Sequence, residues 1–285
     1  MAAIAMLIAG ALCAATLVLA RLPNDRAVSW PTGENTGVPA GVVLKSSGAI
    51  TVTTPGTVID GLLVNGGITV KAKNVTIRNT KVVMGNIDVG DNTGNPMNTL
   101  IEDVELDGTG WSAATTRPGI GYTGYTAHRV NIHGYKDGVN AISNVEVRAS
   151  WIHDMAISGN AQTGSHNQAI LSNGGANLTF VHNRLDAGRE GNFTAALTLL
   201  GDFLQIKNVL VQDNLLNGGG YALYGGSTAS KPYPNADDVR IINNTFGTTV
   251  FPKSGYYGPV TDYRAETGSQ FTGNVWQNTN TTITP

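Results

Sequence analysis

The chain has 285 residues, a formal net charge of −2 at pH 7, only 13% charged residues and 36 glycines. The near-neutral charge and the lack of a basic cluster exclude a nucleic-acid-binding surface, and we find no phosphate loop or dinucleotide fingerprint. Cys13 is the only cysteine, which excludes an intrachain disulfide and a thiolate metal site. Low charge without a sustained 3.6-residue periodicity disfavours a helical protein, whereas abundant Gly, Asn and Thr favour turns and strands.

The first 20 residues are expected to be a targeting segment. They carry no charge, and Val18 and Ala20 form a cleavage-site pattern, which predicts a secretory signal. One alternative is an uncleaved membrane anchor, since 19 apolar residues can span a bilayer. The other is a lipoprotein modified at Cys13. Each of the three places the rest of the chain outside the cytoplasm, and the absence of cysteine from that part favours a bacterial source. Residues 21–41 are expected to form a Pro/Gly-rich linker and N-terminal cap.

A short phrase recurs between residues 57 and 276. In each copy apolar and polar residues alternate, a bend follows, and a large apolar residue closes the phrase. These closing residues are Val64, Val82, Leu106, Ile132, Ile152, Leu185, Leu216, Phe246 and Trp276. Their gaps of 18 to 33 residues, with constant internal offsets, indicate successive turns of one winding.

The position two residues before the closing residue becomes asparagine in the last four copies: Asn183, Asn214, Asn244 and Asn274. A buried amide needs hydrogen-bond partners, so these side chains are expected to bond to one another. We therefore predict an all-β fold: a single parallel winding (solenoid) of about nine coils over residues 42–285, with an internal Asn ladder. The later coils carry insertions, which favours a functional face in the second half.

The phrases resemble those of right-handed parallel β-helix proteins of the pectate-lyase-like superfamily, over about residues 42–278. The segments NTGVPAGVVL (35–44) and GYYGPVTDY (255–263) are also similar to an uncharacterised group of secreted actinobacterial β-helix proteins. The first resemblance implies the fold, and its known members are mostly polysaccharide lyases, glycoside hydrolases and phage tailspike depolymerases. The chain lacks WxDH, NTD, RIK and an adjacent catalytic Asp pair, so pectin is not supported as a substrate.

The residue after the closing apolar position is polar in three successive coils: His133, His153 and Asp186. Side chains at equal phase lie about 4.8 Å apart in such a winding. The pattern predicts a polar row that could serve as an acid–base pair or a weak metal site. The alternative is a solvated turn beside the bend.

The following strand of each late coil, together with loop 225–236, gathers further polar and aromatic residues. The predicted catalytic residues are Lys231, Asp202, Asp262, Arg264 and His166. A lyase needs a base and a cation for the uronate carboxylate, whereas a hydrolase needs two carboxylates at a set separation. The alternative is that these residues cap turns or form surface ion pairs.

Tyrosine rings stack on sugar faces and donate hydrogen bonds, so the same region is predicted to bind substrate. The predicted substrate-binding residues are Tyr224, Tyr233, Tyr256, Tyr257 and Asn167. Tyr256 and Tyr257 fall in an expected strand over 256–264, where adjacent side chains face opposite ways. One of the two is therefore expected in the core and the other in solvent.

These patterns predict a secreted enzyme that cleaves an extracellular polysaccharide, as a lyase or else as a glycoside hydrolase. The alternatives are a non-catalytic glycan-binding or adhesion module and a phage-like spike component. No cofactor is required, although the Asp-rich turns at 201–204 and 235–238 could hold Ca²⁺. The expected partner is a polysaccharide, with no nucleic acid, and with membrane contact only through an uncleaved N-terminal segment. The patterns leave the sugar and the oligomeric state open.

Overall fold

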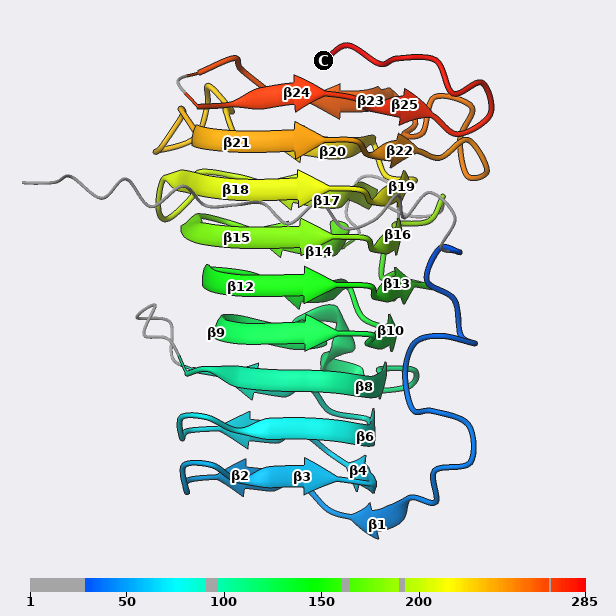
Figure 1. Cartoon of the computed structure of the whole chain (residues 1–285), viewed down its shortest axis with the longest axis vertical. Helices are drawn as coiled ribbons and strands as arrows, with labels where there is room; N and C mark the ends of the chain where they lie inside the picture. The colour runs from blue at the N-terminus through cyan, green and yellow to red at the C-terminus, as the bar shows by residue number, and fades with distance from the viewer. Residues whose placement is uncertain (1–28, 91–96, 160–164, 190–192, 267) are drawn as a thin grey trace, which may run out of the picture.

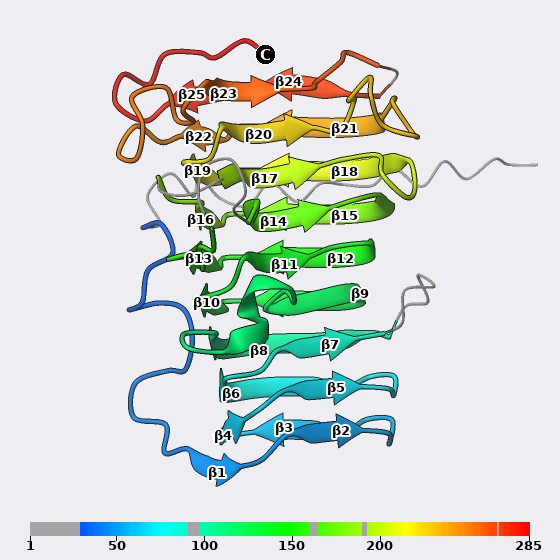
Figure 2. The same cartoon turned by 180° about the vertical axis from the view of Figure 1, so that it is seen from behind.

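The computed structural model describes residues 29–90, 97–159, 165–189, 193–266 and 268–285, and it is a parallel β-helix (Figure 1). The chain winds upward from β1 to β25, and each coil lies on the one before it (Figures 1 and 2). The prediction of an all-β parallel winding is therefore confirmed. The expected targeting segment, residues 1–20, lies outside the described residues. Within them, no helix has the length and apolar character needed to cross a membrane.

Each coil crosses three faces. The first face contains β3 (Val58–Asp60), β6 (Thr76–Val83), β8 (Thr99–Asp107), β9 (Ile120–His128), β12 (Ser143–Arg148), β15 (Gly175–Val181), β18 (Ile206–Gln212), β21 (Asp237–Ile242) and β24 (Gln270–Thr272). The second contains β1 (Lys45–Ser47), β4 (Leu62–Asn65), the ends of β6 and β8, β10 (Asn131–His133), β13 (Trp151–His153), β16 (Arg184–Asp186), β19 (Leu215–Asn217), β22 (Thr245–Phe246) and β25 (Val275–Trp276).

The third face contains β2 (Ile50–Val52), β5 (Ile68–Val70), β7 (Ile87–Val89), the start of β9, β11 (Asp137–Asn140), β14 (Asn167–Ser172), β17 (Phe193–Leu199), β20 (Tyr221–Gly225) and β23 (Gly258–Thr261). A short 3₁₀ helix, η2 (Ser112–Thr115), lies in the connection from β8 to β9. Every pairing between these strands is parallel, and the side chains between the three faces form one continuous core.

The closing apolar residues occupy a single row of this core. Each is paired in register with its counterpart one coil later, from Val64 with Val82 to Phe246 with Trp276. The eight from Val64 to Phe246 are fully buried, and Trp276 of the last coil is half-buried. The register predicted from the repeated phrase is confirmed.

The bend between the first and second faces has the same backbone in every coil. Its residue is left-handed, with φ between 48° and 69°, at Gly61, Asn79, Asp103, Arg129, Ala149, His182, Asp213, Asn243 and Gly273. The next residue points its backbone N–H along the helix axis toward the following coil. Asn214 Oδ1 accepts this N–H from Asn183 at 2.9 Å, and Asn274 Oδ1 accepts it from Asn244 at 2.9 Å. The internal Asn ladder is confirmed, because a buried N–H at this bend needs an acceptor.

Both ends of the described part of the chain pack on the β-helix. Residues 29–44 follow the second face (blue in Figure 1), where the Trp30 ring stacks on His182 at 5.6 Å. The Gly37 N–H donates to the Arg129 carbonyl at 2.8 Å. β1 then pairs with β4 beside the first coil. At the other end, Thr282 forms an antiparallel bridge with Val275 of the last coil.

Candidate functional site

The third face of the last coils carries a cluster of aromatic rings. β20 presents two tyrosines, because the two residues between them are buried in the core. The loop 247–257 adds three more rings beside them. We call this set the aromatic cluster: Tyr221, Tyr224, Phe251, Tyr256 and Tyr257. Centroid distances are 5.9 Å for Tyr221–Tyr224, 5.7 Å for Tyr221–Tyr257, 4.9 Å for Tyr256–Tyr257 and 5.8 Å for Phe251–Tyr256.

Tyr256 and Tyr257 are both exposed, at 61% and 65%. The prediction that one of them lies in the core is wrong. The strand β23 begins only at Gly258, so both tyrosines lie in the preceding loop, where side chains do not alternate between core and solvent. Gly258 is paired with Tyr221, and a Cβ added there would lie 3.3 Å from the Tyr221 ring. Glycine thus leaves space for the ring on β20.

The loop 225–236 forms the opposite wall and is held in place by the charged residues predicted to be catalytic. Lys231 Nζ lies 2.8 Å from Asp202 Oδ1. The Thr228 hydroxyl donates to Asp262 Oδ2 at 2.7 Å. Arg264 donates to Asn235 Oδ1 at 3.1 Å. Each bond ties the loop to an adjacent coil, so these side chains act first as anchors.

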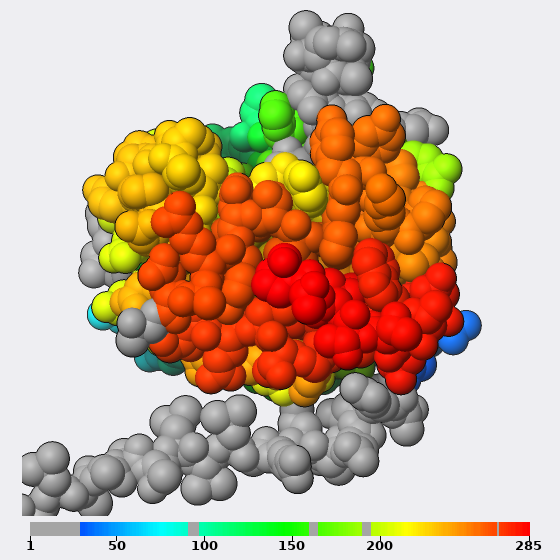
Figure 3. Space-filling view, turned by 90° about the horizontal axis from the view of Figure 1, so that it is seen from above, coloured from blue at the N-terminus to red at the C-terminus, as the bar shows by residue number. Residues whose placement is uncertain are grey.

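The two loops enclose a hollow. Seen from the C-terminal end, loop 225–236 (gold) and loop 247–257 (orange) project on either side, and the surface between them is set back (Figure 3). Tyr224 lies in this part of the third face, and burial together with the nearby Asp262 raises the pKa of its hydroxyl. Tyr233, 43% exposed, stands on the gold loop and lines a separate cavity of about 250 Å³ with Gln205 and Asn235. The predicted Tyr224, Tyr256 and Tyr257 are therefore brought together, and Tyr233 is not among them.

Asn167 begins β14, two coils before β20, and His166 directly precedes the strand. Asn167 is only 1% exposed. Its side chain accepts from the Ser165 hydroxyl at 3.0 Å and donates to the Ala156 carbonyl, which closes the loop before the strand. The predicted contact between Asn167 and a substrate is not supported, because a buried amide with these partners cannot reach a ligand. His166 is exposed.

Sequence reasoning missed a buried carboxyl on the third face. Asp137 in β11 is 6% exposed, with Lys136 Nζ at 3.2 Å. Burial raises its pKa to about 6, against the opposing effect of Lys136. Asp88 in β7 also has a pKa raised by burial, and Arg117 lies 3.3 Å from it. A carboxylate inside a strand of a charge-poor chain was the signal that could have identified Asp137.

The predicted polar row on the second face forms in part. His133 and His153 are paired in register and their rings stack at 5.4 Å. His153 is packed on Trp151 at 3.5 Å, and burial lowers its pKa. Asp186 instead accepts from Trp151 Nε1 at 2.9 Å and from Arg184 at 2.7 Å. The predicted third member therefore bonds to Trp151, which stacks on His153, and not to the histidines themselves.

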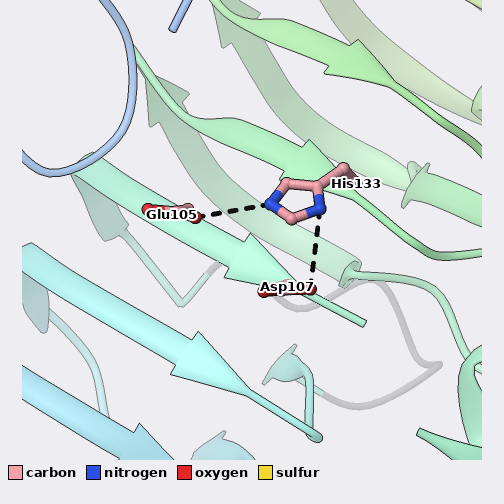
Figure 4. Close-up of side chains that lie close together, drawn as sticks. All are labelled: Glu105, Asp107 and His133. Carbon is pink, nitrogen blue, oxygen red and sulfur yellow. Dashed lines mark hydrogen bonds and ion pairs between the residues drawn. The ribbon is translucent and has the colours of Figure 1, made fainter. Parts of the chain in front are cut away.

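His133 makes its closest polar contacts with the preceding coil (Figure 4). Its Nε2 lies 3.4 Å from Glu105 and its Nδ1 lies 3.5 Å from Asp107. In the described part of the chain, Glu105, Asp107 and His133 form the only group of three side chains that could hold a metal ion. Lys81 already neutralises this group, with Nζ 2.8 Å from Glu105 and 3.6 Å from Asp107. Hydrogen bonds from His133 and Lys81 lower the pKa of Glu105 to about 2.

The Asp-rich turns proposed for Ca²⁺ do not form such a group among the described residues. Asp202 bonds to Lys231, Asp237 pairs with Lys207 at 3.1 Å, and Asp238 pairs with Arg240 at 3.2 Å. Each carboxylate thus has a basic partner of its own.

Fold and surface together define a parallel β-helix protein with an aromatic-lined hollow on its third face. Comparisons with protein families, with curated proteins and with solved structures found no significant match to this chain.

Proposed function

We propose that this chain is a secreted protein of the pectate-lyase-like superfamily that binds an extracellular polysaccharide in the hollow of the third face. The observation that carries the proposal is the aromatic cluster. Five rings lie within 4.9 to 5.9 Å of their neighbours, and two of them are more than half exposed. Exposed tyrosine rings offer sugar faces a stacking surface and hydroxyl groups for hydrogen bonds, with little side-chain entropy to lose.

Binding without cleavage is the function that the geometry supports best. Lys231, Asp202 and Asp262 would have to move protons or neutralise charge during catalysis. Each instead bonds to a partner that holds loop 225–236 against the neighbouring coils. Tyr256 and Tyr257 are instead 61% and 65% exposed, so their ring faces are accessible to a ligand.

Cleavage of the bound chain is the second candidate. It is favoured by Asp137, because a carboxyl group with a pKa near 6 can donate or accept a proton close to neutral pH. In this version the tyrosines bind the polysaccharide and the third face supplies the acid or base. A lyase would yield unsaturated products, and a hydrolase would yield products with intact ends.

The test is to incubate the purified protein with uronate-containing and neutral polysaccharides and to measure retention and products in parallel. The proposal expects retention on at least one polysaccharide, with at least a tenfold loss of affinity in Tyr257→Ala. Phe203→Ala is the matched control, because Phe203 is a 73% exposed ring outside the aromatic cluster. No retention on any polysaccharide, or equal losses in both variants, would refute the binding site. Ultraviolet-absorbing products lighter by one water would establish a lyase, and hydrated products a hydrolase.

A further inference from the structure

A second amide ladder runs along the outside of the corner between the third and first faces. The corner residue of each coil is left-handed, with φ from 49° to 82°: Gly56, Asn74, Asn98, Gly124, Asn144, Asn177, Asn208, Asp238 and Gly268. Asparagine is the residue with a side chain that best tolerates this backbone. The carboxamides bond from coil to coil: Asn98 to Asn74 at 2.6 Å, Asn177 to Asn144 at 2.9 Å and Asn208 to Asn177 at 2.8 Å.

Gly124 interrupts this ladder by one rung. Every bond in the ladder runs from the Nδ2 of one coil to the Oδ1 of the coil before it. An asparagine at position 124 would donate to Asn98 Oδ1 and accept from Asn144 Nδ2. Because residue 124 is glycine, both atoms lack these ladder partners. Within the described ranges of the chain, neither atom has another hydrogen-bond partner. We call this gap, between Asn98 and Asn144, the Gly124 notch.

A cavity of about 280 Å³ opens at the Gly124 notch. Besides the four corner residues Asn98, Gly124, Asn144 and Asn177, it is lined by the polar side chains of Thr126, Glu146 and Thr179. Thr99 and Tyr125 also line it; they are paired in register and each is only 2% exposed, so they form its buried floor.

We propose that the Gly124 notch binds the acetamido group of an N-acetylated sugar. The missing rung is a carboxamide, and successive rungs stand about 4.8 Å apart. In a trans secondary amide, the N–H and the C=O point in opposite directions. The acetamido N–H would donate to Asn98 Oδ1, while its carbonyl would accept from Asn144 Nδ2. The ligand amide would thus continue the ladder through the gap.

The size and lining of the cavity favour a sugar over a peptide. Ligand pockets begin at about 300 Å³, so this cavity suits one sugar unit. The Glu146 carboxylate and the hydroxyls of Thr126 and Thr179 can bond to sugar hydroxyls. A peptide strand would need several unpaired hydrogen-bonding groups in a row, whereas the ladder lacks only one side-chain amide. The Gly124 notch lies along β8 to β12, away from the aromatic cluster on β20 and loop 247–257, so it does not depend on the proposed function.

The test uses the full chain and three probes: a β-1,4-linked tetramer of N-acetylglucosamine, the matching tetramer of glucose, and an N-acetylated dipeptide amide. Binding is measured by calorimetry and by NMR shifts of the Asn98 and Asn144 side-chain amides. The acetylated tetramer is expected to bind at least tenfold more tightly than either other probe and to shift both amides. No binding of the acetylated tetramer, or equal affinity for any second probe, would overturn the proposal.

Two variants and a control keep the test independent of folding. Gly124→Asn supplies the missing rung and is expected to weaken binding at least tenfold with an unchanged or higher unfolding temperature. Asn144→Asp keeps the oxygen that accepts from Asn177 and removes only the donor into the notch, with the same expected loss. Asn74→Asp makes the same chemical change outside the cavity, because it keeps the oxygen that accepts from Asn98, and it is expected to bind normally. Wild-type affinity in a folded Gly124→Asn protein would refute the site.

Discussion

Replacement of Asn214 by alanine is the sharpest test of how the internal ladder holds the coils together. Asn214 is fully buried, and its side chain takes part in four hydrogen bonds. Its Oδ1 accepts from the Asn183 backbone N–H at 2.9 Å and from Asn183 Nδ2 at 3.0 Å. Its Nδ2 donates to the Phe180 carbonyl and to Asn244 Oδ1, both at 2.9 Å. Asn214→Ala removes all four bonds and leaves the Asn183 backbone N–H without its acceptor.

The expected loss of unfolding free energy is about 5 kcal/mol. The orphaned buried donor costs about 1–3 kcal/mol, and the three other bonds contribute about 0.5–1.5 kcal/mol each. In a domain of this size, 1 kcal/mol corresponds to about 2–4 °C, so the unfolding temperature should fall by about 10–20 °C. Calorimetry and urea unfolding would both report the change.

Serine at the same position provides an internal standard. Ser150 occupies the equivalent position of an earlier coil, where its hydroxyl accepts from the Val130 N–H at 3.1 Å. Asn214→Ser restores that acceptor and should recover about half of the loss. Asn65→Ala, at an exposed site at the end of β4, should change stability by less than about 1 kcal/mol. The reasoning fails if Asn214→Ala stays within about 1 kcal/mol of wild type, or if serine is no better than alanine.

Three further predictions concern charged residues. Because burial raises the pKa of Asp137 from 3.8 to about 6, its contribution to stability is present below pH 4 and is lost as the pH rises through 6. Urea unfolding from pH 4 to 7 should show that decline in wild type and not in Asp137→Asn. Glu105 has the opposite sign: its pKa falls from 4.5 to about 2, so its contribution holds above pH 4.5 and is lost toward pH 2. Glu105→Gln should flatten this acid limb, and an unchanged limb would contradict the assignment. Lys231→Met should lower the free energy of unfolding by less than about 1 kcal/mol. It should nevertheless accelerate hydrogen exchange at the Tyr233 backbone N–H, which donates to the Gly201 carbonyl at 2.9 Å. Unchanged exchange would show that the ion pair does not anchor the loop.

The features that repeat in every coil could be predicted from the sequence. The row from Val64 to Trp276 and the ladder from Asn183 to Asn274 each recur at a constant phase, and the structure pairs them in register. A repeated environment selects a repeated residue type, so the period carries the information directly. The outer ladder follows the same logic, because its left-handed corner residue recurs once in every coil.

The features that occur once could not be predicted in the same way. Tyr256 and Tyr257 were assigned to a strand because a strand is expected on the third face of each coil. The strand begins two residues after Tyr256, and no repeated neighbour marks that start. Asp137 was overlooked because burial, and not a sequence motif, shifts its pKa. In both cases the deciding quantity is the local packing of one coil.

The period of the winding also predicts which side chains contact each other between neighbouring coils, including those that anchor loop 225–236. In a winding of about 30 residues, a residue lies beside whatever stands one coil later, as reliably as positions i and i+4 meet on a helix. Asp202 and Lys231 are 29 residues apart, Asn235 and Arg264 are 29 apart, and Thr228 and Asp262 are 34 apart. Each pair combines side chains that can hydrogen-bond, so each could be expected as a contact from its spacing alone. Once these partners are assigned, Asp202, Lys231, Asp262 and Arg264 each take part in a contact that holds loop 225–236. Tyr256 and Tyr257, the most exposed rings of the aromatic cluster, are then the groups best placed to meet a ligand.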